Sequence, residues 1–144
     1  MTKYLSEVFV EKCIINWLFQ KGYSKGLNLK DISAHGVDIK VRHKDYPRYY
    51  FVEVKGDPNP KTHKYPSSAR EVNFNYALGQ ILTRMKTKSS DHYAIAFPES
   101  FSKKVISRLP WLVCKKLNLN VFIVDNAGQV RNLTWKQLKK EQIN

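Results

Sequence analysis

The sequence has few cysteines and no long apolar run. Its two cysteines, Cys13 and Cys114, form no C-x-x-C pair, so neither a disulfide scaffold nor a cysteine zinc site is expected. No run approaches the roughly 20 apolar residues that a membrane span needs. Residues 1–4 lack the charged, apolar and small-residue zones of a secretory signal peptide. We therefore expect a cytoplasmic location.

Acidic residues are also scarce, because 12 Asp and Glu stand against 25 Lys and Arg and leave a net charge of +13. With 42% hydrophobic and 12% aromatic residues, the chain is too apolar for a disordered polycation. Its 144 residues are expected to fold as one domain over 1–144. The positive charge attracts polyanions through phosphate contacts, so nucleic acid is the expected partner. A surface coated with solvated lysines is the alternative.

Hydrophobic periodicity predicts the order α-β-β-β-α-β-α-β-β-α. Apolar residues at three- and four-residue spacing indicate helices over residues 6–21, 72–85, 101–109 with a continuation to 117, and 135–141, the last capped by Thr134. Alternating or short apolar runs indicate strands over 27–31, 37–41, 49–55, 92–98, 121–125 and 130–133. Three prolines and three basic side chains make residues 56–66 a basic loop. The predicted class is α/β or α+β, a central mixed sheet flanked by helices.

Two strands of a predicted hairpin carry acidic side chains. The segments are Gly36-Val37-Asp38-Ile39 and Phe51-Val52-Glu53-Val54-Lys55-Gly56. Glu53 and Lys55 project from one face of their strand, and a hairpin partner would bring Asp38 beside them on that face. Two carboxylates and a backbone carbonyl suit a hard cation such as Mg²⁺. A solvated ion-pair ladder on an edge strand is the alternative interpretation.

The combination of segments resembles the PD-(D/E)xK phosphodiesterase superfamily, whose fold is called restriction-endonuclease-like. A helix with a glutamate, G-x-D-I in one strand, apolar-apolar-E-V-K-G in the next and a helix with A-L-G-Q follow one another in the order of that superfamily. The resemblance spans residues 8–85 and is similar to Holliday-junction resolvases and exonuclease-like branches. Val37 replaces the proline of the superfamily name, which is a departure tolerated in many members.

The resemblance implies a site for Mg²⁺, for which Mn²⁺ can substitute. It implies metal ligation by the carboxylates of Asp38 and Glu53 and by the carbonyl of Val54. Lys55 would assist the attack of water on the phosphodiester.

The resemblance also implies two helix residues beside the metal. Glu11 is the expected glutamate of the first helix, as a further metal ligand and catalytic group, because it lies eleven positions before Gly22. Glu7, one turn earlier, is the second choice. Gln80 is similar to the glutamine that lies beside the active site on the next helix, although a glutamine on a helix surface needs no function.

The expected function is therefore metal-dependent hydrolysis of DNA, with structure-dependent or weakly sequence-specific cutting of duplex, branched or single-stranded substrates. Basic side chains in and after the loop are candidates for phosphate contacts, namely Lys61, His63, Lys64, Arg70 and Arg84. A nucleic-acid-binding module or accessory subunit without useful turnover is the alternative function. Many members of the superfamily dimerise, so a homodimer is compatible with the resemblance, although no heptad or single apolar stripe marks an interface.

Overall fold

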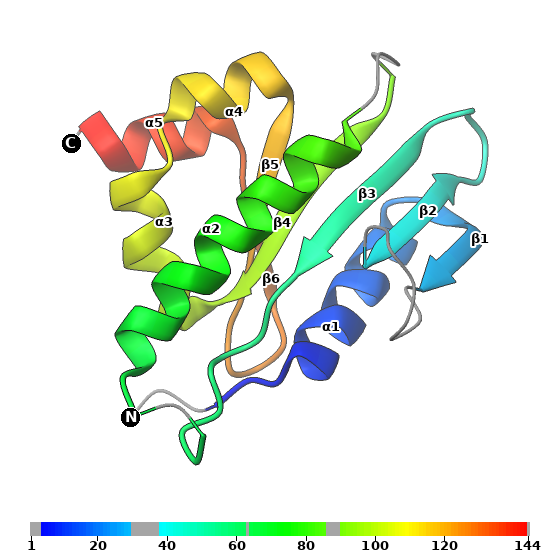
Figure 1. Ribbon diagram of the computed structural model, residues 1–144. Helices are drawn as coiled ribbons and strands as arrows, with labels where there is room; N and C mark the ends of the chain where they lie inside the picture. The colour runs from blue at the N-terminus through cyan, green and yellow to red at the C-terminus, as the bar shows by residue number, and fades with distance from the viewer. Residues whose placement is uncertain (1–3, 30–37, 63, 86–89, 144) are drawn as a thin grey trace.

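A six-stranded mixed sheet forms the centre of the structure, and its strands lie side by side in chain order (Figure 1). The structure is a computed structural model that describes residues 4–29, 38–62, 64–85 and 90–143. The strands are β1 (Tyr23–Leu29), β2 (Ile39–His43), β3 (Tyr49–Val54), β4 (His92–Pro98), β5 (Leu119–Val124) and β6 (Val130–Leu133). The pairs β1·β2, β2·β3 and β5·β6 are antiparallel, whereas β3·β4 and β4·β5 are parallel.

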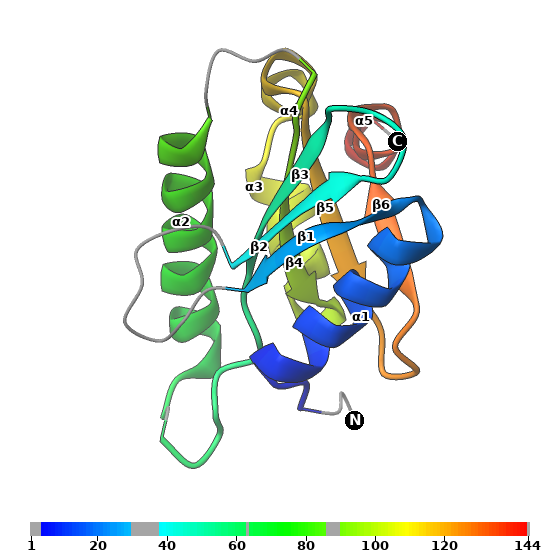
Figure 2. The same cartoon turned by 90° about the vertical axis from the view of Figure 1, so that its right-hand side faces the viewer.

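Helices cover both faces of this sheet. Those of the described residues are α1 (Glu7–Gln20), α2 (Pro66–Arg84), α3 (Ser102–Arg108), α4 (Trp111–Leu117), α5 (Trp135–Ile143) and the short 3₁₀ helix η1 (Glu99–Phe101). Parallel neighbours need a crossover, and α2 joins β3 to β4 while α3 and α4 join β4 to β5. Seen edge-on, α1 and α2 lie on opposite sides of the sheet (Figure 2).

Two apolar clusters, one on each face, hold the layers together. Side chains of α2, α3, α4 and α5 pack on Tyr93, Ile95 and Phe97 of β4. The alternate β4 residues, Ala94 and Ala96, face the cluster formed with α1. This alternation follows from the two-residue repeat of a strand, and it explains why β4 is buried on both faces.

The structure confirms the predicted class and the predicted order of elements, except that the single helix expected over 101–117 is divided into η1, α3 and α4. The strands expected at 92–98 and 130–133 have those bounds, and the Thr134 hydroxyl caps α5 by accepting the Gln137 N–H. Three starts were predicted too late, and one of them is that of β5, which begins at Leu119 rather than at residue 121. β1 begins at Tyr23, directly after Gly22, and α2 begins at Pro66 rather than at residue 72. A proline at the first helical position is favourable, but the polar turn that follows it carries no apolar period to detect.

None of the helices in the described part of the chain combines the length and the apolar character that a membrane span requires.

Candidate active site

The carboxyl end of β3 places Glu53 and Lys55 on the face of the sheet that α2 covers. Glu53 is 0% exposed and is paired with Ile95 of β4, which belongs to the apolar cluster on that face. Lys55 directly follows the strand, and its N–H donates to the Ala96 carbonyl at 3.0 Å, so the parallel pairing extends through it. Ligands of open α/β sheets bind beyond the carboxyl ends of the strands, and Glu53 is the last residue but one of β3 while Lys55 is the first residue after it.

Asp38 lies against this end of β3, as the hairpin predicted. The antiparallel register pairs Ile39 with Val52, and continued by one residue it places Asp38 opposite Glu53. The Val54 N–H donates to Asp38 Oδ2 at 2.7 Å. This bond replaces a ladder bond beyond the end of β2 and fixes the Asp38 carboxylate beside the E-x-K segment. The other residues of the G-x-D-I motif before Asp38 lie outside the described residues.

The ammonium group of Lys55 lies over an aromatic ring of α2. Its Nζ is 4.7 Å from the centroid of the Tyr76 ring, within the range of a cation–π contact. Tyr76 is itself 58% exposed, so the contact lies at the surface. The ring therefore restrains Lys55 without removing it from solvent.

Backbone contacts join the start of α1 to the segment after Lys55. The Leu5 N–H donates to Asp57 Oδ2 at 2.8 Å, and the Asp57 N–H donates to the Leu5 carbonyl at 2.8 Å. A Cβ on Gly56 would lie 2.2 Å from the Glu7 backbone N, so only glycine fits between the two segments. The glycine of the E-V-K-G motif thus lets α1 begin directly beside the candidate site.

Glu11, on α1, is the helix glutamate that interacts with Asp38. Its pKa is raised from the ordinary value of 4.5, first by burial and then by the negative charges of Asp38 and Glu7. Glu7 is exposed and Glu11 is half-buried. These observations favour Glu11 over Glu7 as the acid nearest to the site.

The donor set suits a hard divalent cation. Asp38 and Glu53 supply carboxylate oxygens, and the Val54 carbonyl is a third oxygen donor of the same chain segment. Among the described residues there is no cluster of three or more His, Cys, Asp or Glu side chains, so Glu11 does not join Asp38 and Glu53 in one such cluster. The residues present therefore fit a site with two carboxylates, one of which, Asp38, interacts electrostatically with Glu11.

Three of the predicted site residues lie on α2, at different distances along the helix from Tyr76. Gln80 follows Tyr76 by one turn, on the same side of α2, and is half-buried. Arg84 is in the last turn, 14 positions after Arg70, which corresponds to about 21 Å along the helix axis. Arg70 and Arg84 therefore cannot hold the same phosphate.

The basic loop residues are solvent-accessible. Lys61 and Lys64 are exposed, and the Lys64 ammonium is 5.8 Å from the Tyr65 ring centroid. His63 lies outside the described residues. The role of the loop in phosphate binding stays a prediction.

Sequence reasoning missed three residues of this region. Asp57 positions the loop after Lys55, and Tyr76 contacts the Lys55 ammonium. Lys40 lies on the same face, with its ammonium 5.1 Å from the Tyr49 ring centroid. The acid that directly follows E-V-K-G was a usable signal for Asp57, whereas the Tyr76 contact depends on how α2 packs on the sheet.

No protein-family model matches the chain, and no curated protein matches it significantly. Two solved structures are similar. One is an XisH family protein from Nostoc punctiforme PCC 73102, with 15% identity, 85% of this chain and 96% of that chain covered, and a TM-score of 0.48. The other is an fdxN element excision controlling factor protein from Anabaena variabilis, with 15% identity, 86% and 96% coverage, and a TM-score of 0.46. At these values neither likeness bears on function.

Proposed function

We propose that this chain is a metal-dependent nuclease that hydrolyses phosphodiester bonds of DNA. The observation that carries the proposal is the position of Asp38, whose carboxylate accepts the Val54 N–H at 2.7 Å opposite the buried Glu53. In a chain with a net charge of +13, two adjacent carboxylates at a strand end repel phosphate unless a cation lies between them and the substrate. The resemblance of the motif to the PD-(D/E)xK superfamily, which implies metal-binding acids at these positions, supports the proposal.

Asp38, Glu53 and the Val54 carbonyl would hold Mg²⁺. When bound, Mg²⁺ would supply Lewis-acid polarisation of the phosphate and would favour deprotonation of the attacking water. Lys55, restrained by the Tyr76 ring, would donate a hydrogen bond to that water and offset the negative charge that develops on the phosphate. Glu11 and Gln80 would act from the periphery, where they orient groups around the two carboxylates.

Cleavage of labelled DNA tests the proposal. Duplex, single-stranded and four-way-junction substrates are incubated with Mg²⁺ or Mn²⁺ and wild type, Glu53→Gln or Lys55→Met. Both substitutions keep the approximate shape of the side chain and remove its charge. We expect metal-dependent cutting that falls by at least about 10²-fold in both variants. Glu141→Gln and Lys25→Met, which are the same changes on α5 and on β1, serve as matched controls.

The absence of a three-acid cluster in the described residues favours a second candidate, which is DNA binding without useful turnover. It predicts that no substrate is cut by wild type with either metal. Binding to DNA would then be weakened by salt and unchanged by Glu53→Gln.

A further inference from the structure

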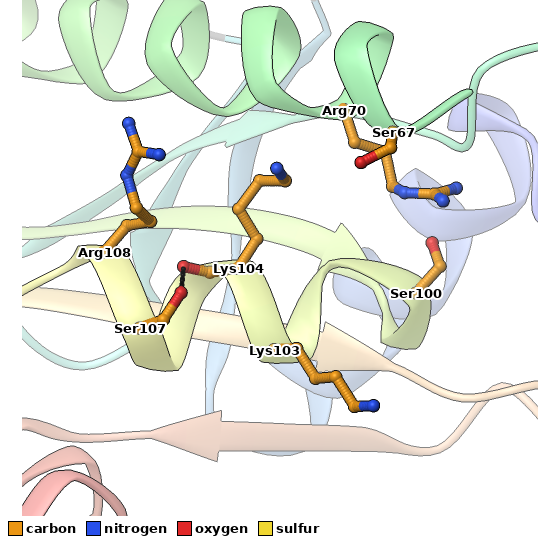
Figure 3. Close-up of a pocket in the computed structure, with 7 residues that line it drawn as sticks. All are labelled: Ser67, Arg70, Ser100, Lys103, Lys104, Ser107 and Arg108. Carbon is orange, nitrogen blue, oxygen red and sulfur yellow. Dashed lines mark hydrogen bonds between the residues drawn. The ribbon is translucent and has the colours of Figure 1, made fainter. Parts of the chain in front are cut away.

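A second group of charged side chains lines an open pocket between α2 and α3 (Figure 3). Three hydroxyls line it, those of Ser67, Ser100 and Ser107. Four cations line it as well, namely Arg70, Lys103, Lys104 and Arg108. These residues come from α2, η1 and α3, which are far apart in the sequence and converge only in the fold.

The cations of this pocket converge from two helices. Lys104 and Arg108 point from α3 toward α2, and Arg70 points from α2 toward α3 (Figure 3). Lys103 points away from the other three and lies at the edge. Guanidinium groups and hydroxyls are the donors that proteins use to hold phosphate oxygens, because each supplies directed N–H or O–H groups.

One carboxylate, that of Glu71, already occupies part of this donor set. Its Oε2 is 2.6 Å from the Lys104 Nζ, and its Oε1 is 2.5 Å from Arg108 Nη2. The two oxygens of Glu71 therefore bridge Lys104 and Arg108 in the way that two oxygens of one phosphate group would. A single carboxylate does not neutralise four cations, so the pocket keeps a net positive charge.

The pocket adjoins the segment that follows Lys55. The Ser100 hydroxyl donates to Asp57, which is two residues after Lys55 and is held by Leu5. Arg70 precedes Tyr76 by six positions, or about 9 Å along α2, which corresponds to about two or three nucleotides at 3.4 Å per nucleotide. A DNA strand that is cut beside Lys55 would therefore have another phosphate, about two or three nucleotides from the cut, at the pocket.

We propose that the pocket between α2 and α3 binds a phosphate group of the nucleic-acid strand. The inference rests on the proposed function, since it takes the strand to be the substrate of the site at Asp38, Glu53 and Lys55. Two sources share this chemistry, an internal phosphodiester and a terminal 5′ phosphate. Arg70, Lys104 and Arg108 supply the charge, while Ser67 supplies a hydroxyl donor.

Fluorescence anisotropy of 3′-labelled oligonucleotides tests the pocket, with EDTA present so that nothing is cut. Arg70→Ala/Arg108→Ala is compared with Lys25→Ala/Lys44→Ala, which removes two charges from β1 and from the turn between β2 and β3. We expect the pocket variant to bind about tenfold more weakly than the control pair. Its salt slope should be smaller by about 0.9 on duplex or about 0.7 on single strands. Equal affinities and slopes for the two pairs overturn the inference.

The two sources of phosphate are separated by oligonucleotides with and without a 5′ phosphate. A loss of affinity on both kinds assigns the pocket to an internal phosphodiester. A loss confined to the phosphorylated kind assigns it to the strand end. Circular dichroism and thermal unfolding confirm that each variant is folded.

A second variant has the opposite expected sign. Glu71→Gln removes the carboxylate that competes with phosphate for Lys104 and Arg108, so it should bind DNA about twofold to fivefold more tightly than Asp45→Asn. Asp45 is an exposed acid in the turn between β2 and β3, so the control makes the same change in net charge. If Glu71 only joins the two helices, Glu71→Gln binds no more tightly than Asp45→Asn, and the inference fails.

Failure of the pocket differs from failure of the nuclease. If wild type cuts DNA and Glu53→Gln does not, while the pocket variants bind like their controls, the pocket inference alone is wrong. If no DNA is cut but the pocket variants lose affinity as expected, the proposed nuclease is wrong and the phosphate pocket stands.

Discussion

Two groups of charged side chains lie near the carboxyl end of β3 and differ in sign and in burial. The first, Asp38, Glu53 and Lys55, has an excess of acid, and its central glutamate is fully buried. The second, the pocket between α2 and α3, has an excess of base and is open to solvent. A buried acid interacts strongly with nearby charges because the effective dielectric constant around it is low. Exposed cations, in contrast, hold a strand through many weak contacts. Under the two proposals, hydrolysis falls to the first group and strand binding to the second.

The largest expected effect comes from removing the negative charge of Asp38 while keeping the hydrogen bond that Asp38 accepts from the Val54 N–H. Asp38→Asn keeps an oxygen that accepts the Val54 N–H, and Asp38→Ala does not. We expect both variants to lose at least about 10²-fold in cleavage rate, because both lack the carboxylate charge. Thermal unfolding should separate them, with Asp38→Ala less stable by about 1 kcal/mol and Asp38→Asn close to wild type. Wild-type cutting by Asp38→Asn would contradict the assigned role.

The next largest effect is expected from moving α1 away from the first group, which is Asp38, Glu53 and Lys55. In Gly56→Ala the new Cβ would lie 2.2 Å from the Glu7 backbone N, so the two segments must move apart. We expect a loss of about 1–3 kcal/mol of stability in urea unfolding, together with reduced cleavage. Gly79→Ala is the control, since nothing lies within 4 Å of a Cβ at that helical position. Equal stability of the two variants would show that the contact is dispensable.

A smaller effect is expected from the ring that restrains Lys55. Tyr76→Ala removes the cation–π contact of 4.7 Å, and Tyr76→Phe keeps the ring. We expect the alanine variant to cut about twofold to fivefold more slowly, as suits an exposed contact, and the phenylalanine variant to match wild type. Single-turnover cleavage measures this difference. Loss of activity in Tyr76→Phe would assign the role to the phenol hydroxyl instead.

The smallest expected effect is on the pH dependence of stability, and it compares Glu11, beside the first group, with Glu71, beside the pocket. Burial, and then Asp38 and Glu7, raise the pKa of Glu11 above 4.5, so the folded chain holds this proton to higher pH than the unfolded chain. Its contribution to stability therefore falls as pH rises through 4.5 and the raised value. The hydrogen bond from Lys104 lowers the pKa of Glu71, so its contribution is present above 4.5 and is lost as pH falls.

The glutamine variants should therefore shift Tm in opposite directions at neutral pH. Glu11→Gln should melt slightly higher than wild type and Glu71→Gln slightly lower, and both differences should disappear in acid. Thermal unfolding between about pH 3 and pH 8 in EDTA measures the two curves. Differences of the same sign would mean that the two carboxylates share one kind of environment.

Most of the fold, and the centre of the site, could be predicted from the sequence because both follow from short-range patterns. The alternation of β2 and β3 determined which side chains share a face, and that placed Asp38 opposite Glu53. The pocket could not be predicted in this way. Arg70 and Arg108 are brought together by the packing of α2 and α3 on one sheet face, and Glu71 pairs with Lys104 across 33 positions. Such contacts depend on crossover geometry, which no local period encodes.

The central claim is that the first group hydrolyses DNA and that the pocket binds the strand. The measurement that tests this claim most directly is the single-turnover cleavage of labelled DNA as a function of protein concentration. Each curve gives a maximal rate and a half-saturating concentration. We predict that Glu53→Gln lowers the maximal rate by at least about 10²-fold, whereas Arg70→Ala/Arg108→Ala raises the half-saturating concentration about tenfold. A wild-type maximal rate in Glu53→Gln would contradict the account, because the buried acid of β3 would then have no part in hydrolysis.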